Sequence, residues 1–517
     1  MAKNEERSAV TPRLQGTQHP VLYEVNTRVL LHELSQESGD AMTLADIPDR
    51  IVDEWCALGI DAVWLMGVWT TGALGRQLAL DTPGLHEEYR RSLPDVTADD
   101  ILGSPYAVQE YRVAPALGGG KALRALRTRL AKKGIGLILD YVSNHTARDH
   151  AWVKQHPEYY VHSDPARNGA QITDGFLAQT AAGELMIAYG RDPMFPGWTD
   201  TAQLNVHSKV ARAAMVTQLE DIAEVCDGVR CDMAMLLLAD VFERTWNDRS
   251  ARPEDDRAEG EFWREAIGQV TASHPGFMFI AEAYWNREWD LQQLGFNYTY
   301  DKTLYDRLLR EGASAVRDHL KADMVYQTRS LRFLENHDEE RAARMLPSEQ
   351  WQFAAATVVA TVPGMFLLHD GQMEARNVRV PVQLRRRVAE MPNERSRAFY
   401  TALLGIIDQP VFRVGAWRML QLRAAWHDNH TWHNFISYWW HDPVHGDRLV
   451  VVNYAPHSGQ VYVDVPLDLL EGHLVEFKDL LGGATYTRER LALHAKGMYF
   501  DLPGYGIHIF EATAAEK

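Results

Sequence analysis

Cysteine is scarce in this chain, which has three among its 517 residues: Cys56, Cys226 and Cys231. An odd, widely spaced set without metal-ligand spacing argues against a disulfide framework. No apolar run approaches the roughly 18 residues of a membrane-spanning helix. The first eight residues, Met-Ala-Lys-Asn-Glu-Glu-Arg-Ser, show no apolar core of a secretory signal. We therefore expect a cytoplasmic protein without a membrane partner.

Positive charge is also in short supply. The chain carries 53 Lys and Arg against 70 Asp and Glu, a formal net charge of −17. Such a surface disfavours phosphate backbones, so we expect no nucleic-acid partner. The hydrophobic content of 46% is ordinary for a globular chain, and the length allows one large domain with smaller ones. The sequence does not indicate an oligomeric state.

Four short apolar runs each end in a carboxylate. They span residues 136–140, 228–232, 277–282 and 331–338, and end at Asp140, Asp232, Glu282 and Asp338. A short apolar run bounded by Gly is typical of a buried parallel strand. In a closed α/β barrel all carboxyl ends of the strands open onto one face, where catalysis takes place.

Amphipathic helical patterns separate these runs from one another. Residues 22–27, 62–66, 298–301 and 364–368 add four candidate strands, which makes eight. Repetition of strand, helix and Gly indicates an α/β fold with a parallel sheet, and eight strands match a (β/α)8 TIM barrel. An open doubly wound sheet is the alternative. Acids at four separate strand ends favour the barrel, because closure brings distant strands to one centre.

The distribution of residue types along the chain predicts four parts. Residues 1–19 form a polar N-terminal tail, and residues 20–142 and 207–414 build the barrel. Residues 143–206 break the alternation with prolines and polar residues, which predicts an inserted domain after the third strand. From residue 415 to 517, strand-like segments separated by turns predict a C-terminal antiparallel β-domain.

The residues around the four acids resemble the signature regions of the α-amylase family, retaining α-glucoside enzymes on a TIM barrel. The matching segments are Asp140-Tyr-Val-Ser-Asn-His145, Gly228-Val-Arg-Cys-Asp232, Ala281-Glu-Ala-Tyr284, Glu335-Asn-His-Asp338 and, for a fifth region, Gln203-Leu-Asn205. Their order is that of the family, and the resemblance covers roughly residues 20–517. It implies an α-glucan or disaccharide substrate.

The resemblance also implies roles for eight residues. Asp232 corresponds to the nucleophile, Glu282 to the general acid/base and Asp338 to the stabiliser of the transition state. Tyr106, His145, Arg230 and His337 correspond to residues that bind the first sugar, and Asp140 to a structural partner of Arg230. The residue types suit the chemistry, because retention uses two carboxylates about 5–5.5 Å apart.

Elementary physical chemistry agrees with these roles. Glu282 must be protonated near neutral pH, and an apolar flank with two neighbouring carboxylates raises the pKa of a carboxyl. Arg230 lies two residues before Asp232 on one strand, so both point to the same face. Cys231 then faces the other way and packs. Among the tryptophans, Trp69, Trp152, Trp198, Trp285 and Trp289 can stack on sugars or belong to the core and rim.

The chain departs from the family pattern after the nucleophile, where Met233 and Ala234 replace the usual Lys-His pair. Asn144 matches one ligand of the family's structural calcium, but the remaining ligand pattern is not recognisable. We therefore expect no metal or other cofactor, and a structural calcium is not supported. The long segment 70–103 is expected to wall off the leaving-group side, which favours short α-glucans or disaccharides over polymers.

Three functions remain open on the sequence. The first is a hydrolase or transglycosylase with a covalent glycosyl-enzyme. The second uses a sugar phosphate or phosphorolysis, because arginines crowd the segment after the last strand, where TIM barrels often bind phosphate; they are Arg376, Arg379, Arg385, Arg386, Arg387, Arg395 and Arg397. The third is a non-catalytic amylase-like binding protein, against which the three intact acids argue.

Overall fold

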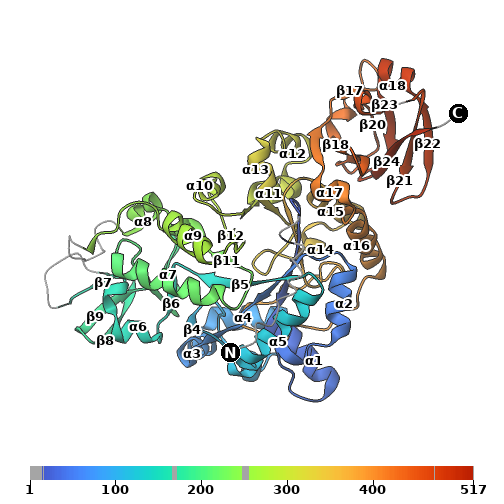
Figure 1. Cartoon of the computed structure of the whole chain (residues 1–517). Coiled ribbons are helices and arrows are strands. Elements are labelled where there is room, and N and C mark those ends of the chain that lie inside the picture. The colour runs from blue at the N-terminus through green and yellow to red at the C-terminus, as the bar shows by residue number, and fades with distance from the viewer. Residues whose placement is uncertain (1–13, 15–16, 166–171, 247–255, 471, 516–517) are drawn as a thin grey trace, which may run out of the picture.

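Eight parallel strands close into a barrel at the centre of the molecule (Figure 1). The computed structural model describes residues 14, 17–165, 172–246, 256–470 and 472–515. Around the barrel the strands are β1 (Val21–Asn26), β2 (Ala62–Met66), β5 (Gly136–Val142), β11 (Gly228–Asp232), β12 (Met278–Ala281), β13 (Tyr298–Tyr300), β14 (Ser330–Arg332) and β15 (Met365–His369). The TIM barrel is thus confirmed, and the open sheet is wrong.

The strands have two faces because successive side chains alternate. Leu22, Trp64, Ile138, Ile280 and Leu367 belong to one buried cluster that draws on seven of the eight strands and fills the barrel. The other face packs on the surrounding helices α1 (Thr27–Ser38), α2 (Asp49–Ala57), α5 (Gly119–Lys132), α7 (Lys209–Ala223), α9 (Phe262–Ser273), α11 (Lys302–Arg310), α15 (Glu349–Thr361) and α16 (Glu394–Ile407).

Strand β11 is the exception among the eight. Its inward positions hold Gly228, Arg230 and Asp232, so a cation and a carboxylate replace apolar side chains there. Cys231 packs in the outer layer, as expected. A Cβ at Gly228 would lie 2.6 Å from the carbonyl oxygen of Met278, which requires glycine where β11 and β12 approach.

The four acids differ in their distance from the strand ends. Asp232 is the last residue of β11 and Glu282 directly follows β12. Asp140 instead lies inside β5, with two strand residues after it, and Asp338 lies six residues beyond the end of β14. The strand predicted to end around Asp338 therefore ends already at Arg332, and a segment without helix or strand carries Asp338 to the barrel mouth.

Two excursions leave the barrel at its carboxyl face. The insertion after β5 contains β6 (His145–Ala147), α6 (Ala151–Gln155), β7 (His162–Ser163), β8 (Gly175–Thr180), β9 (Gly183–Ala188) and β10 (Thr201–Gln203). The segment after β2, expected as a loop, contains β3 (Trp69–Thr71), α3 (Ala73–Asp81), α4 (Pro83–Ser92) and β4 (Val108–Val113).

The C-terminal β-domain consists of two antiparallel sheets and lies at the end of the molecule remote from the insertion (Figure 1). Six strands form the larger sheet: β16 (Ala416–Met419), β18 (Phe435–Asp442), β19 (Gly446–Asn453), β24 (Ile507–Ala515), β21 (Leu474–Asp479) and β22 (Thr485–Glu489). The smaller one contains β17 (Leu422–Ala424), β20 (Gly459–Val463) and β23 (Met498–Leu502). The Trp440 indole N–H donates to the carbonyl of Thr361 at 2.7 Å and ties this domain to the barrel.

Among the described residues, no helix is both long enough and apolar enough to span a bilayer. Of the predicted polar tail, Leu14 is described and is buried against the barrel.

Candidate active site

A cavity of about 380 Å³ opens at the carboxyl ends of the barrel strands. Five of the eight predicted site residues line it: Tyr106, His145, Asp232, Glu282 and Asp338. The other three, Asp140, Arg230 and His337, are buried and contact members of this set. The structure thus brings together all eight residues, which come from segments up to 232 positions apart in the chain (Tyr106 to Asp338).

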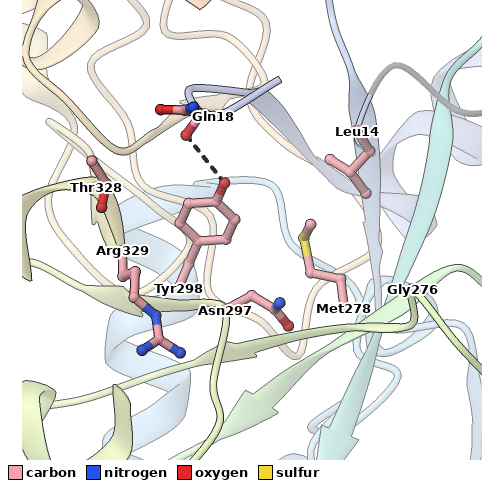
Figure 2. A pocket seen from close by; sticks show the side chains of 8 residues that line it. All are labelled: Leu14, Gln18, Gly276, Met278, Asn297, Tyr298, Thr328 and Arg329. Carbon is pink, nitrogen blue, oxygen red and sulfur yellow. Dashed lines mark hydrogen bonds between the residues drawn. The ribbon is translucent and has the colours of Figure 1, made fainter. Parts of the chain in front are cut away.

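A second cavity, of about 560 Å³, lies at the opposite end of the barrel, where the strands begin (Figure 2). Met278 and Tyr298, the first residues of β12 and β13, line it together with Leu14 and Gln18. Arg329, the one charged residue among the described residues that line it, donates to the carbonyl of Phe296 at 2.5 Å. The described lining includes no carboxylate, so we assign this cavity no chemistry.

Arg230 forms the centre of the candidate active site. Its Nη1 lies 2.6 Å from Oδ1 of Asp232 and its Nη2 lies 2.8 Å from Oε2 of Glu282. Three aromatic rings surround the guanidinium, with centroids 5.2 to 5.7 Å from its central carbon: Trp64, Tyr106 and Tyr300. One buried cation therefore holds two carboxylates side by side.

Asp140 is a weaker partner of Arg230 than the sequence suggests. The nearest atoms of this pair are 3.9 Å apart. Its two oxygens instead accept hydrogen bonds from the indole of Trp64 and the backbone N–H of Gly67, both at 3.2 Å. Burial, opposed in part by Arg230, raises the pKa of Asp140 to about 6. Asp140 thus fixes the positions of the Trp64 indole and of the backbone at Gly67.

Glu282 is buried and accepts hydrogen bonds on both oxygens. The backbone N–H of Met233 donates to Oε2 at 2.6 Å, and the hydroxyl of Tyr284 donates to Oε1 at 2.9 Å. Met233 has a left-handed backbone, with φ of 43°, a strained conformation that clusters at functional sites. Burial, opposed by Arg230 and reinforced by Asp232 and Asp338, raises the pKa of Glu282 to about 7.

His337 lies between two carboxylates. Its Nδ1 is 2.6 Å from Oε1 of Glu24, and its Nε2 is 3.0 Å from Oδ2 of Asp338. Burial alone lowers the pKa of an imidazole, but these two acids raise the pKa of His337 well above its usual value. The ring is therefore a cation, and Tyr106 stacks on it at 5.4 Å between centroids.

His145 and Trp198 form the insertion's side of the cavity, with ring centroids 5.1 Å apart. Burial lowers the pKa of His145, so its ring is neutral. Of the other candidate tryptophans, Trp69 is buried and donates to the backbone carbonyl of Asp140 at 2.7 Å. Trp152 packs inside the insertion against Tyr159. Trp285 and Trp289 are exposed.

Sequence reasoning missed several residues of the site. Glu24 lies inside the strand segment Tyr23-Glu24-Val25 and does not end an apolar run, so the sequence gives no sign of its role. The fold brings it next to His337. Tyr284 stands inside a quoted motif without an assigned role. Asp200 and Gln383 also line the cavity, and burial raises the pKa of Asp200.

The arginine-rich segment after β15 docks on the excursion after β2. The backbone N–H of Leu102 donates to the carbonyl of Gln383 at 2.8 Å, and Leu384 packs with Ile101. Arg386 contacts both oxygens of Asp100 at 2.9 Å. Five of the seven arginines pair with carboxylates in this way: Arg379, Arg386, Arg387, Arg395 and Arg397. We call this contact between residues 376–390 and 73–103 the clamp.

Asn144, which the sequence matches to a calcium ligand of the family, pairs with Gln203. Its Oδ1 accepts a hydrogen bond from Nε2 of Gln203 at 2.9 Å, and its Nδ2 donates to Oε1 of Gln203 at 3.2 Å. Within the described ranges, no group of three or more His, Cys, Asp and Glu side chains is arranged to hold a metal ion.

The chain is similar to known enzymes over most of its length. It is 23% identical to the trehalose synthase/amylase TreS of Mycobacterium tuberculosis, over 77% of this chain and 62% of that protein. It is 23% identical to the α-1,4-glucan:maltose-1-phosphate maltosyltransferase of Rhodospirillum rubrum, over 82% of this chain and 56% of that protein. The chain thus spans less than two thirds of the length of these relatives.

Comparison of structures and a family model complete the assignment. The maltogenic α-amylase AmyB of Thermotoga neapolitana shares the fold, with a TM-score of 0.66 at 19% sequence identity, covering 96% of this chain and 99% of that one. The model of the α-amylase catalytic domain matches residues 53–397, which is more than half of the chain. The chain therefore belongs to the α-amylase family of glycoside hydrolases and transglycosylases.

Proposed function

We propose that the protein is a retaining enzyme that acts on one terminal α-glucosyl unit of short α-glucans or disaccharides. The observation that carries this proposal is the guanidinium of Arg230, which contacts Asp232 at 2.6 Å and Glu282 at 2.8 Å. Two carboxylates on one guanidinium lie close together. This favours the roughly 5–5.5 Å separation of retaining enzymes over the roughly 6.5–9.5 Å of inverting ones.

The roles follow from the electrostatics of each carboxylate. Glu282, with a pKa of about 7, carries a proton near neutral pH and protonates the leaving oxygen. Asp232, at the end of β11 and lining the cavity, attacks the anomeric carbon and forms the covalent glycosyl-enzyme. Glu282 then takes a proton from the hydroxyl that resolves this intermediate.

Asp338 and His337 bind the sugar in this proposal. Burial opposes the charge on Asp338, but the imidazolium of His337 lowers the pKa of Asp338 to about 2, so it stays anionic beside the developing positive charge of the sugar. Tyr106 supplies an aromatic face, and His145 offers a neutral ring to sugar hydroxyls.

The clamp closes the cavity on the side away from Glu282. In the ring of eight strands β12, which Glu282 follows, lies opposite β1, four strands away in either direction. The two halves of the clamp follow β2 and β15, the two neighbours of β1. We infer that this wall stands at the non-reducing end of the bound sugar, whereas the sequence predicted a wall on the leaving-group side. In this proposal a chain enters by its terminal unit.

The clamp also bears on the phosphate alternative. Arginines that already face carboxylates, such as Arg386 with Asp100 and Arg387 with Asp370, are neutralised within the fold. We interpret the arginine-rich segment as a structural clamp, and the proposed substrate carries no phosphate. Either water or a sugar hydroxyl can resolve the glycosyl-enzyme, depending on which has better access to it. A product assay that detects chains longer than the starting one distinguishes transfer from hydrolysis.

Trapping of the intermediate tests the proposed function. A 5-fluoro-α-glucosyl fluoride should add one glycosyl unit to the peptide that contains Asp232, as read by mass spectrometry. The Asp232→Asn variant should remain unlabelled. A label on another residue, or an inverted β-anomer as the first product seen by NMR, would contradict the proposal.

A further inference from the structure

The two oxygens of Glu282 face chemically different partners. Oε2 meets the backbone N–H of Met233 at 2.6 Å and the guanidinium of Arg230 at 2.8 Å. Both of these groups can only donate a hydrogen bond. Oε1 meets the hydroxyl of Tyr284 at 2.9 Å, and a hydroxyl can donate or accept.

This asymmetry decides which oxygen carries the proton of the general acid. A proton on Oε2 would face the N–H of Met233, which is hydrogen-bonded to it, and the guanidinium of Arg230, which is ion-paired with it, and neither group can accept a hydrogen bond. On Oε1 the proton can point to Tyr284 or into the cavity, which both Glu282 and Tyr284 line. The protonated form of Glu282 therefore carries its proton on Oε1.

We propose that Tyr284 is a positioning residue for this proton: its hydroxyl accepts a hydrogen bond from protonated Oε1 before bond cleavage and donates one to ionised Oε1 afterwards. The inference rests on the proposed function, in which Glu282 is the general acid/base. It adds a residue to which neither the sequence motifs nor the comparisons gave a role.

The step balances with Tyr284 as a partner that keeps its own proton. As the bond between the anomeric carbon and the leaving oxygen breaks, a carboxylate oxygen of Asp232 forms a bond to that carbon and the Oε1 proton passes to the leaving oxygen. The Tyr284 hydroxyl then turns and donates to the new carboxylate. In the second half, the oxygen of the attacking hydroxyl bonds to the anomeric carbon while the bond from that carbon to Asp232 breaks. Oε1 takes the proton of that hydroxyl, and Tyr284 turns back. Burial raises the pKa of Tyr284 well above its usual value, so the phenol stays neutral throughout.

The backbone after Tyr284 supports a fixed position for its ring. Trp285 and Asn286 are both left-handed, with φ of 63° and 59°, a conformation that is unfavourable for residues other than glycine. The N–H of Arg287 closes the turn on the carbonyl of Tyr284 at 3.2 Å. Two consecutive strained residues directly behind Tyr284 are the kind of outlier that clusters at functional sites.

Other charged and titratable groups face Glu282 and are unchanged when Tyr284 is altered. They are Arg230 and Asp232 from β11, Tyr300 from β13 and Asp338 after β14. A change in the ionisation of Glu282 in a Tyr284→Phe variant therefore reports the loss of the phenol hydroxyl. The direction is upward, because the hydrogen bond that the phenol donates to the charged carboxylate is stronger than the one that it accepts from the neutral acid.

The experiment reads Glu282 directly in the substrate-free protein. Infrared titration of the carboxyl band, with the Glu282→Gln spectrum subtracted, gives the pKa of Glu282. Tyr284→Phe should move that pKa upward by roughly half to one pH unit. The control is Tyr111→Phe, because the hydrogen bonds of the Tyr111 hydroxyl to described residues go to the backbone of Val142 and not to Glu282. An unchanged Glu282 titration in Tyr284→Phe would overturn the inference.

Kinetics give a second, independent reading. Tyr284→Phe should lower kcat/KM on maltose about 10- to 100-fold, part of what general acid catalysis contributes. Its kcat/KM on 2,4-dinitrophenyl α-glucoside, whose leaving group departs without a proton, should change less than threefold. Equal losses on both substrates would overturn the positioning role. If the wild type cleaves neither substrate, the proposed function fails, and the infrared titration still decides the Tyr284–Glu282 relationship.

Discussion

The imidazole of His337 is held by Glu24, whose Oε1 lies 2.6 Å from Nδ1, while Asp338 lies 3.0 Å from Nε2 on the other side. Glu24 is fully buried on β1, and His337 follows β14. Two acids thus share one buried cation. This arrangement orients His337 and keeps it charged, so that Nε2 can hold Asp338 in place for the sugar.

Replacing Glu24 with Gln should therefore reduce both stability and activity. Removing one member of a buried ion pair typically costs about 3–5 kcal/mol. Because the folded-state pKa of His337 is raised, the stability that it contributes is fully present below its unfolded pKa of about 6.5. That contribution is lost as pH rises through the folded-state value. The loss in Glu24→Gln should be largest near pH 6 and shrink at alkaline pH, as measured by urea unfolding.

A matched control for this variant is Glu54→Gln. Glu54 pairs with Arg397 at the surface, where such a bridge contributes about 1 kcal/mol or less. An equal loss of stability in both variants, or a loss in Glu24→Gln that does not vary with pH, would show that Glu24 does not act through the charge of His337.

The nucleophile prediction concerns Asp232. Asp232→Asn is nearly isosteric, and Arg230 keeps its contact with Glu282, so the fold should persist. Turnover should fall by at least about 10⁴-fold, because no other group forms the covalent bond. Initial rates measure the loss of turnover, and circular dichroism tests whether the fold persists. Asp318→Asn, at an exposed pair with Lys321, is the control, and substantial turnover by Asp232→Asn on a natural substrate would mean that another residue attacks.

Glu282 predicts a pH dependence of the same sign as that of His337, because its folded-state pKa is also raised. Burial, opposed by Arg230 and reinforced by Asp232 and Asp338, raises the folded-state pKa of Glu282 to about 7 from an unfolded value of 4.5. The folded protein thus binds this proton more tightly, and stability falls as pH rises between these values. Glu282→Gln should equal the wild type near pH 4.5 and exceed it at pH 8 by up to about 3 kcal/mol. The same stabilisation at both pH values would contradict the raised pKa, as would a wild-type kcat/KM that stays constant from pH 6 to 9.

The sequence predicts the barrel and its acids because both depend on local patterns. An apolar run such as 228–232 encodes a strand and places Asp232 at its end without reference to the rest of the chain. Glu24 and Arg386 lack such a signal, because their partners are distant in the sequence. His337 lies 313 positions from Glu24 and Asp100 lies 286 from Arg386. The role of Tyr284 depends on hydrogen-bond geometry around Glu282, which no spacing encodes.

Chelation should leave the protein unaffected. The oxygen of Asn144 that would face a calcium ion accepts from Gln203 at 2.9 Å. A bound structural ion stabilises the folded state by mass action, so its removal would lower the Tm. We expect EDTA to change the Tm by less than about 1 °C and activity by less than twofold. A drop of several degrees that added calcium reverses would show that the insertion binds a metal ion.

The last prediction follows from the clamp and concerns substrate length. With the non-reducing side closed, maltotetraose should release glucose one unit at a time, and kcat/KM should be higher on maltose, trehalose, sucrose or maltotetraose than on soluble starch.

Arg386→Gln removes the contact of Arg386 with both oxygens of Asp100, and should raise the ratio of kcat/KM on maltotetraose to that on maltose. A tenfold change corresponds to about 1.4 kcal/mol. Arg395→Gln, which breaks an exposed pair with Glu349 outside the clamp, should leave the ratio unchanged. Internal cleavage of starch by the wild type, faster than any short sugar, would mean that the groove is open at this end.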